Sequence, residues 1–155
     1  MIIGDSSALV ALATMDRLDL LEKIFGEIYV PQAVYDEVTI SYKAQSVKLK
    51  EFLADKIVSV ELDISKMGLG QGELEAIALY KNMDANFLLI DDRRAKKFAK
   101  LNGVNVIGSL GVMILAKDGG FVNSICEDLE KLVGSSLFIS QSLVDRVLRE
   151  VGEKS

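Results

Sequence analysis

The feature that most constrains the fold is the start of the chain, where an apolar run changes from a strand-like to a helix-like pattern between residues 2 and 12. Ile2 and Ile3 are β-branched and fit a short, fully buried strand, which Gly4 ends. A buried strand that leads directly into an apolar helix is the first half of a parallel β–α unit. The chain is therefore predicted to be an α/β protein, with Asp5 at the edge where open parallel sheets bind ligands.

Asp5 has two interpretations at this point. Taken alone, it is better explained as a cap, beside Ser6 and Ser7, of the apolar helix that residues 8–12 open, since short polar side chains accept hydrogen bonds from the first N–H groups of a helix. A ligand-binding role becomes the better explanation only if other carboxylates reach the same edge of the sheet.

The rest of the sequence repeats the alternation of short apolar strands and amphipathic helices. Strands are predicted near residues 2–4, 27–30, 86–90 and 104–107, with residues 57–60 as a strand or an extended segment. Helices are predicted over residues 16–25, 32–38, 47–53, 73–80, 93–101, 109–117 and 140–151, and Asn123 is expected to cap another. The glycine-rich residues 68–72 match no nucleotide-binding motif and are interpreted as a loop before a helix. With no repeat or long linker, residues 1–155 are predicted to form a single domain.

The composition excludes several kinds of site. The chain has no histidine, which removes Ser-His-Asp and Cys-His nucleophiles, histidine general bases and histidine zinc ligands. Cys126 is the only cysteine, so an intramolecular disulfide and a paired-thiolate metal site are excluded. The net charge of −5 argues against nonspecific clamping of nucleic acid, although a local basic patch remains compatible with it.

The start of the chain lacks the basic segment of a signal peptide, and an acid already occurs at position 5. No apolar run approaches the length of about 20 residues that spans a bilayer. Together with the single cysteine, these features predict a cytoplasmic protein without a membrane partner.

Four further acids are predicted near the sheet edge that holds Asp5. Glu37 lies in the helix after Pro31, Glu73 in the first turn of its helix, and the pair Asp91-Asp92 directly after a strand. Solvation, the helix dipole and capping explain each acid alone, but one aspartate of the pair is surplus for capping. Oxygen ligands without histidine or thiolate suit Mg²⁺ or Mn²⁺, so phosphoryl chemistry is the predicted reaction class.

A basic helix follows these acids. Its cations are Arg93, Arg94, Lys96, Lys97 and Lys100. A solvated cationic face explains them as well as a role in binding phosphate does. The second interpretation gains weight because the predicted metal site directly precedes this helix on an otherwise acidic protein.

Four stretches that occur in order resemble the PIN-domain family, which includes the VapC ribonuclease toxins. They are residues 5–7 (DSS), 30–38 (VPQAVYDEV), 70–77 (GQGELEAI) and 88–94 (LLIDDRR), and residues 103–112 (GVNVIGSLGV) resemble a PIN-like branch of the family. The resemblance covers nearly the whole chain. It implies a PIN-like three-layer α/β/α sandwich with a central parallel sheet of four to five strands, often assembled as a homodimer.

The resemblance also implies an activity, which is metal-dependent hydrolysis of RNA phosphodiester bonds by a Mg²⁺- or Mn²⁺-dependent endoribonuclease. Asp5 matches a direct metal ligand, and Glu73 matches an acid that completes the metal site. Asp91 and Asp92 both cover the position of another acidic ligand, and the match does not choose between them. Glu37 matches the acid that orients a water molecule.

Further roles follow from the same resemblance. Ser6 is expected to hydrogen-bond phosphate or ligand, and Arg93 and Arg94 are expected to hold the RNA backbone. A VapC-like role would make the chain the toxin of a toxin–antitoxin pair, with an antitoxin protein as partner. One residue departs from the family pattern, because many members carry threonine or serine where this chain has Ile90.

Two other classes of protein compete with the nuclease. A PIN-like module that is catalytically weak or inactive, and binds RNA or protein, keeps the fold and is favoured if the chain fails to bind Mn²⁺. A receiver-like phosphoacceptor also gathers acids at strand ends around Mg²⁺. It leaves Glu37 and Glu73 unexplained, and no lysine follows a late strand where such a domain would need one.

Overall fold

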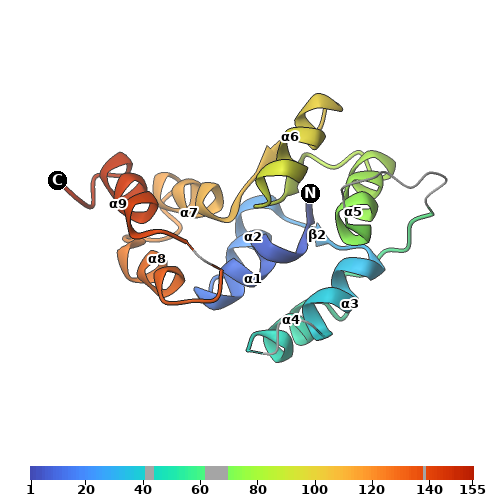
Figure 1. Ribbon diagram of the computed structural model, residues 1–155, viewed down its shortest axis with the longest axis horizontal. Helices are drawn as coiled ribbons and strands as arrows, with labels where there is room; N and C mark the ends of the chain where they lie inside the picture. Colours follow the sequence, from blue (N-terminus) through green and yellow to red (C-terminus); the bar gives the residue numbers. More distant parts are fainter. Residues whose placement is uncertain (41–43, 62–69, 138) are drawn as a thin grey trace.

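The computed structural model describes residues 1–40, 44–61, 70–137 and 139–155, and in these the chain forms a parallel sheet flanked by helices (Figure 1). The sheet has four strands in the order β2-β1-β3-β4. Their bounds are Ile2–Gly4 for β1, Ile28–Tyr29 for β2, Phe87–Leu89 for β3 and Val106–Ile107 for β4. This is the predicted PIN-like α/β/α sandwich, with four strands in the described part of the chain.

The strand β1 lies in the middle of the sheet, because it pairs with β2 on one side and β3 on the other. Ile3 lies opposite Tyr29 in β2 and Leu88 in β3. Ile2, Ile3 and Leu88 are completely buried, as expected for a parallel sheet whose two faces are covered by helices. The carboxyl end of β1, where Asp5 follows, is therefore central to the sheet edge.

The helices connect and cover these strands. They are α1 (Ser6–Thr14), α2 (Asp19–Phe25), α3 (Gln32–Ile40), α4 (Ser46–Leu53), α5 (Gln71–Asn82), α6 (Arg93–Leu101), α7 (Ser109–Asp118), α8 (Cys126–Val133) and α9 (Gln141–Glu150). α5 packs on β1 and β3 and against α3, which pairs with α4, while α7 packs on α1 and α2. Figure 1 shows the α8–α9 pair at the left end of the molecule and the α3–α4 pair along its lower side, below α5. Within the described residues, no helix is long and apolar enough to span a membrane.

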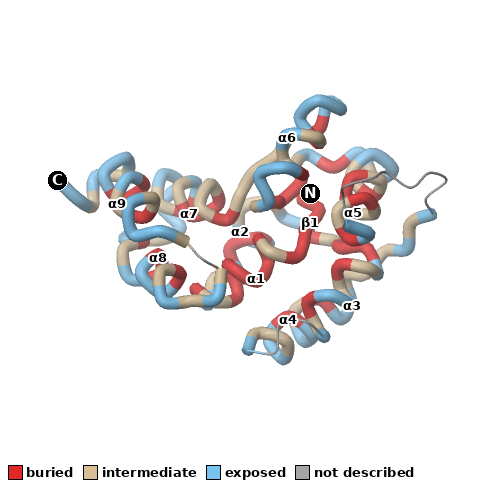
Figure 2. Tube along the Cα trace, in the orientation of Figure 1, coloured by how far each residue is buried: buried red, intermediate tan, exposed pale blue. Residues whose placement is uncertain are grey.

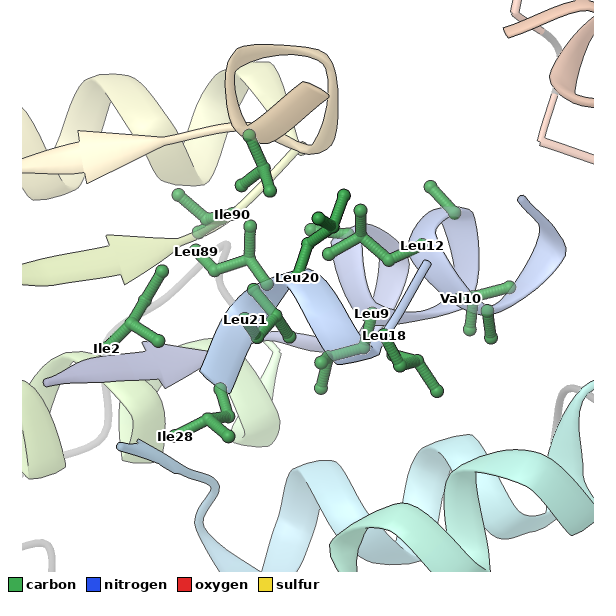
Figure 3. Close-up of a cluster of buried hydrophobic side chains, with 14 of the residues drawn as sticks. Ile2, Leu9, Val10, Leu12, Leu18, Leu20, Leu21, Ile28, Leu89 and Ile90 are labelled. Atoms are coloured by element: carbon green, nitrogen blue, oxygen red, sulfur yellow. The ribbon is translucent and has the colours of Figure 1, made fainter. Parts of the chain in front are cut away.

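The helix α1 is enclosed on nearly all sides. Each residue from Ala8 to Ala13 is at most 3% exposed, and Figure 2 shows this helix as a buried segment at the centre of the molecule. In Figure 3, Leu9 and Leu12 of α1 belong to one cluster with Ile2 of β1 and with side chains of α2 and β3. A helix that is apolar on all sides must be central, so α1 fixes the position of the polar residues at its start.

Several predicted boundaries differ from the structure. Of residues 57–60, only Ile57 pairs with a strand-like partner, through a single parallel bridge to Val30. α5 begins at Gln71, earlier than predicted, and so includes Gly72. The rest of the glycine-rich stretch, up to residue 69, lies outside the described residues. Cys126, the only cysteine of the sequence, is partly buried.

The predicted cap of α8 was wrong. The helix begins at Cys126, and the carboxylate of Glu153 accepts hydrogen bonds from the backbone N–H groups of Ile125 and Cys126, at 2.9 and 3.0 Å. Lys117 Nζ donates to the same carboxylate at 3.0 Å. A residue near the C-terminus therefore does what Asn123 was expected to do, and it connects α7, α8 and the segment after α9.

Replacing Glu153 by Gln is expected to lower the free energy of unfolding at pH 7 by about 1–2 kcal/mol, because charge-assisted hydrogen bonds are lost. Burial raises the pKa of Glu153, but the hydrogen bonds from Ser124, Ile125, Lys117 and Cys126 outweigh it and lower the pKa to about 2. The folded-state pKa is below the unfolded value of 4.5, so this stabilisation is present above pH 4.5 and is lost as the pH falls toward 2.

Urea denaturation at pH 7 and pH 3 checks this prediction. The difference between the wild type and Glu153→Gln should be smaller at pH 3. Glu150→Gln, an exposed change at the end of α9, is the matched control and should shift the free energy of unfolding by less than about 0.5 kcal/mol. Equal effects of the two substitutions would contradict the proposed cap.

Candidate active site

Asp5 is the buried acid at the centre of the site. It directly follows β1, and its backbone N–H donates to the carbonyl of Leu89 in β3 at 2.9 Å. Its side chain is only 3% exposed. Asp5 occupies the N-cap position of α1, but its side chain does not make the capping hydrogen bond. Helix capping therefore does not explain why a carboxylate is buried here, and the explanation must lie in the groups around it.

The pKa of Asp5 shows what surrounds it. Overall, the pKa is raised from 3.8 to about 7; burial is the largest cause of the rise, and a hydrogen bond from the backbone of Ser6 opposes it. The negative charges of Glu73, Glu37 and Asp92 contribute the rest of the rise. These acids come from α5, α3 and the start of α6, so widely separated parts of the sequence act on one carboxyl group.

Glu37 is joined to the start of α1. Ser6, which is itself buried, donates a hydrogen bond from its Oγ to Glu37 Oε2 at 2.9 Å. Gly72 lies close to the same group, because a Cβ at that position would be 3.2 Å from Glu37 Oε2 and 3.8 Å from Asp5 Oδ1. The missing side chain at position 72 thus lets the first turn of α5 approach both carboxylates.

Glu73 also faces this site. Its Oε2 accepts a hydrogen bond from the backbone N–H of Gly70 at 3.0 Å. Burial raises the pKa of Glu73, the hydrogen bond from Gly70 lowers it, the charges of Asp92 and Glu37 raise it, and Arg94 lowers it. The net direction is upward, which indicates that Glu73 shares the negative potential around Asp5.

Two neighbouring acids, Glu75 and Asp91, accept hydrogen bonds from other parts of the chain. Glu75 accepts a hydrogen bond from the backbone N–H of Ala33 at 3.2 Å, at the start of α3. Both oxygens of Asp91 are held by Ser109, one by its backbone N–H at 2.7 Å and one by its Oγ at 2.7 Å. Asp91 therefore binds the start of α7, and it is not among the largest causes of the raised pKa of Asp5.

Asp92 differs from Asp91 in this respect. One of its oxygens caps α6, accepting from the N–H of Ala95 at 2.8 Å, and its charge acts on both Asp5 and Glu73. The structure thus separates two aspartates that are adjacent in sequence. We call Asp5, Glu37, Glu73 and Asp92 the acid cluster.

The donor chemistry of the acid cluster fits a hard divalent cation. Its four side chains offer only carboxylate oxygens, the ligands that Mg²⁺ and Mn²⁺ prefer. A cation would also favour the charged form of Asp5, whose pKa is high without one. In the residues that the structure describes, no three His, Cys, Asp or Glu side chains are grouped closely enough to form a metal site as placed.

The two arginines predicted to bind substrate lie in different surroundings. Arg94 acts electrostatically on Glu73 in the acid cluster. Arg93 instead lines a cavity of about 320 Å³ together with Ser7, Asp92 and Ile139. That cavity lies directly beside the acid cluster, because Asp92 belongs to both.

Sequence reasoning missed Gly72 and Ser109 at this site. Gly72 was interpreted only as part of a loop before a helix, although a glycine in the first turn of a helix is a signal of close approach by another group. Ser109, which is 1% exposed and holds Asp91, had no local signal, because its partner is 18 residues away.

Comparison with known proteins identifies a family model that matches the chain. A family model described as a PIN domain (DUF3368) matches residues 1–153. No curated protein and no solved structure matches the chain. PIN domains are generally nucleases that use divalent metals. With a family model that covers nearly all of the sequence, and with the parallel sheet described above, the chain belongs to the PIN-domain family.

Proposed function

We propose that the protein is a Mg²⁺- or Mn²⁺-dependent ribonuclease that hydrolyses RNA phosphodiester bonds at the acid cluster. The observation that carries this proposal is the buried Asp5 with three other carboxylates acting on it; its pKa rises to about 7, first through burial and then through those charges. Such a concentration of negative charge at a central sheet edge destabilises the fold and is relieved by a divalent cation. Membership of a family of nucleases supports hydrolysis of a nucleic acid.

Each residue of the acid cluster has a distinct task in this proposal. Asp5, Glu73 and Asp92 would hold the cation, since their charges act on one another. A bound divalent ion supplies charge neutralisation at the phosphate and makes water a better nucleophile. Glu37 is exposed and is oriented by Ser6, which suits a carboxylate that accepts a hydrogen bond from the attacking water.

The arginines and serines would position the substrate. Arg93, on the wall of the adjacent cavity, would bind a phosphate of the RNA backbone. Arg94 lies close to Glu73 and would keep that carboxylate ionised. Asp91 has no direct part in the reaction here, because both of its oxygens are bound to Ser109.

The biological part of the proposal is a VapC-like toxin of a toxin–antitoxin pair, acting in the cytoplasm as a homodimer with an antitoxin protein as its partner. Its support is the ordered set of sequence stretches that resemble that group, from residues 5–7 to residues 88–94. The choice of RNA as substrate has the same support.

A cleavage assay on structured and unstructured RNA tests the proposed function. With Mn²⁺, the wild type should cleave RNA, EDTA should stop cleavage, and renewed Mn²⁺ should restore it. Asp5→Asn should lower the rate by at least about 1,000-fold, since it removes the central carboxylate. Failure to bind Mn²⁺ by calorimetry would favour a noncatalytic binding module, and full activity of Asp5→Asn would refute the site.

A further inference from the structure

The segment after α9 makes a tight turn whose geometry is fixed by the backbone. Gly152 has a φ of +80°, which glycine adopts without strain, and its N–H donates to the carbonyl of Arg149 at 3.1 Å. The N–H of Glu153 donates to the carbonyl of Leu148 at 2.8 Å. These two bonds form a Schellman motif, which ends a helix at a defined residue. The turn therefore holds Glu153 in a fixed position relative to α9.

Glu153 then fills a complete carboxylate site at the start of α8. Its Oε1 accepts hydrogen bonds from Ser124 Oγ at 2.5 Å and from the backbone N–H of Cys126 at 3.0 Å. Its Oε2 accepts from the N–H of Ile125 at 2.9 Å and from Lys117 Nζ, in the last turn of α7, at 3.0 Å. The Glu153 side chain is only 10% exposed, and charge-assisted hydrogen bonds of this kind are short and strong. The segment after α9 is therefore joined to α7 and α8 at once.

The length of α9 is held in a different way. Val144, Val147 and Leu148 are buried, and α9 packs on α8. Hydrophobic burial has no direction, so it selects the face of α9 that is covered but does not fix the helix along its axis. At the start of α9, Gln141 donates an exposed hydrogen bond to Glu130 of α8 at 3.1 Å. The buried and directional contact of Glu153 is therefore the stronger constraint on the axial position of α9.

The start of α9 lies beside the acid cluster. Ile139, just before the helix, lines the cavity of about 320 Å³ to which Asp92 also belongs. Ile139 and Leu143 together line a further cavity of about 540 Å³ along α6. A helix rises about 1.5 Å per residue, so the ten residues of α9 span roughly 15 Å between this wall and the turn at Gly152. A rigid helix of that length transmits a shift at its end to its start.

We propose that Gly152 and Glu153 form a latch that positions the start of α9 as a wall beside the acid cluster. Glu153 is a positioning residue here, because it acts through α9 and none of the four acids of the cluster belongs to that helix. The consequence for RNA rests on the proposed ribonuclease function. Without the latch the wall moves and RNA binds more weakly, while the chemical step at the acid cluster is preserved.

Steady-state cleavage of RNA tests this role. Glu153→Ala should raise KM about 5- to 10-fold and keep kcat within about 2-fold of the wild type, the sign of lost binding rather than lost chemistry. A merely structural role would lower kcat with the folded fraction and leave KM unchanged. Measurements are made well below the unfolding midpoint of the variant. Glu150→Ala is the matched control, because Glu150 is the exposed last residue of α9, and both of its parameters should match the wild type.

Methyl NMR without RNA tests the position of the wall directly. In Glu153→Ala the methyl signals of Ile139 and Leu143 should shift relative to the wild type. The methyl signal of Ile40 should not, because Ile40 is exposed at the end of α3, in another part of the fold. Glu150→Ala should leave all of these signals in place.

Acetate separates the latch from a simple cap, because it can occupy the vacated site but does not join α8 to α9. At an acetate concentration that restores the free energy of unfolding of Glu153→Ala, the KM of this variant should stay high. Insertion of two glycines between Gly152 and Glu153 keeps the carboxylate but lengthens its link to α9, so KM should rise here as well. A KM that returns to the wild-type value in acetate, or that is unchanged by the insertion, would overturn the latch.

The outcomes separate this inference from the proposed function. If the wild type cleaves RNA but Glu153→Ala has the KM and the methyl signals of the wild type, the latch is overturned and the nuclease stands. If no metal supports cleavage but the signals of Ile139 and Leu143 shift in Glu153→Ala and not in Glu150→Ala, the latch stands and the nuclease falls.

Discussion

The Asp5→Asn protein is expected to be more stable than the wild type at pH 8, by between about 1 and 4 kcal/mol, while it loses RNA cleavage. The upper figure follows from a carboxyl group whose pKa is about 7 in the folded chain and 3.8 as a model value. Asn has nearly the same shape and carries no charge, so it removes both the cost of burying the carboxylate and the repulsion from the neighbouring acids.

The stability difference between Asp5→Asn and the wild type should also depend on pH, in a direction that can be checked. The folded-state pKa of Asp5 is above the unfolded value, so the stability contributed by this group is fully present below pH 3.8 and is lost as the pH rises toward 7. The advantage of Asp5→Asn over the wild type should therefore increase between pH 4 and pH 7 and stay constant above it.

Urea denaturation in EDTA at pH 5, 7 and 8.5 measures that advantage, because EDTA removes any cation that would stabilise the wild type. Asp36→Asn, an exposed change on α3, is the control and should shift the free energy of unfolding by less than about 0.5 kcal/mol. A wild type that is more stable than Asp5→Asn at pH 8.5 would show that Asp5 serves the fold rather than a site.

Asp92→Asn and Asp91→Asn are expected to have opposite consequences, although the two residues are adjacent. Asp92→Asn should lower RNA cleavage at least 100-fold with little loss of stability, since asparagine caps a helix about as well as aspartate and can still accept from Ala95. Asp91→Asn should keep cleavage within about 10-fold of the wild type but lower the free energy of unfolding by about 1–2 kcal/mol, because the charged acceptor of Ser109 is lost.

A double-mutant cycle makes the role of Asp91 specific. Ser109→Ala should also destabilise the fold, and combining it with Asp91→Asn should cost clearly less than the two single effects added together, because one change removes the charge of the acceptor and the other removes the donor of the same hydrogen bond. Cleavage rates and urea denaturation are measured on the same four proteins. Loss of cleavage in Asp91→Asn comparable to that in Asp92→Asn would contradict the assignment of the acid cluster.

Much of the fold could be predicted from the sequence because its signals are local. Each strand lies in a short apolar run, and a glycine or an aspartate ends the runs of β1, β3 and β4. The basic helix α6 begins and ends where its pattern does, from Arg93 to Leu101. Helix geometry places residues two apart on different faces, and accordingly Glu75 turns to the start of α3 while Glu73 faces the acid cluster.

The rest depends on contacts between residues that are distant in sequence. Glu153 caps α8 from 27 residues away, so no pattern near Asn123 could show that the local candidate was wrong. Asp91 and Asp92 both follow β3, so the local sequence does not distinguish them. They differ in their distant partners: Asp91 is bound by Ser109, whereas the charge of Asp92 acts on Asp5. Periodicity predicts which face of an element is buried, but it does not identify the partner of a polar side chain at the sheet edge.

The enclosure of α1 has a consequence for how such a site can change over evolution. The helix that follows Asp5 has no free face, so a substitution along it disturbs the core before it can adjust the chemistry. Glu37, Glu73 and Asp92 belong to peripheral segments that each contribute a single acid. New substrate preferences are therefore expected to arise through α3, α5 and α6, around a central carboxylate that stays in place.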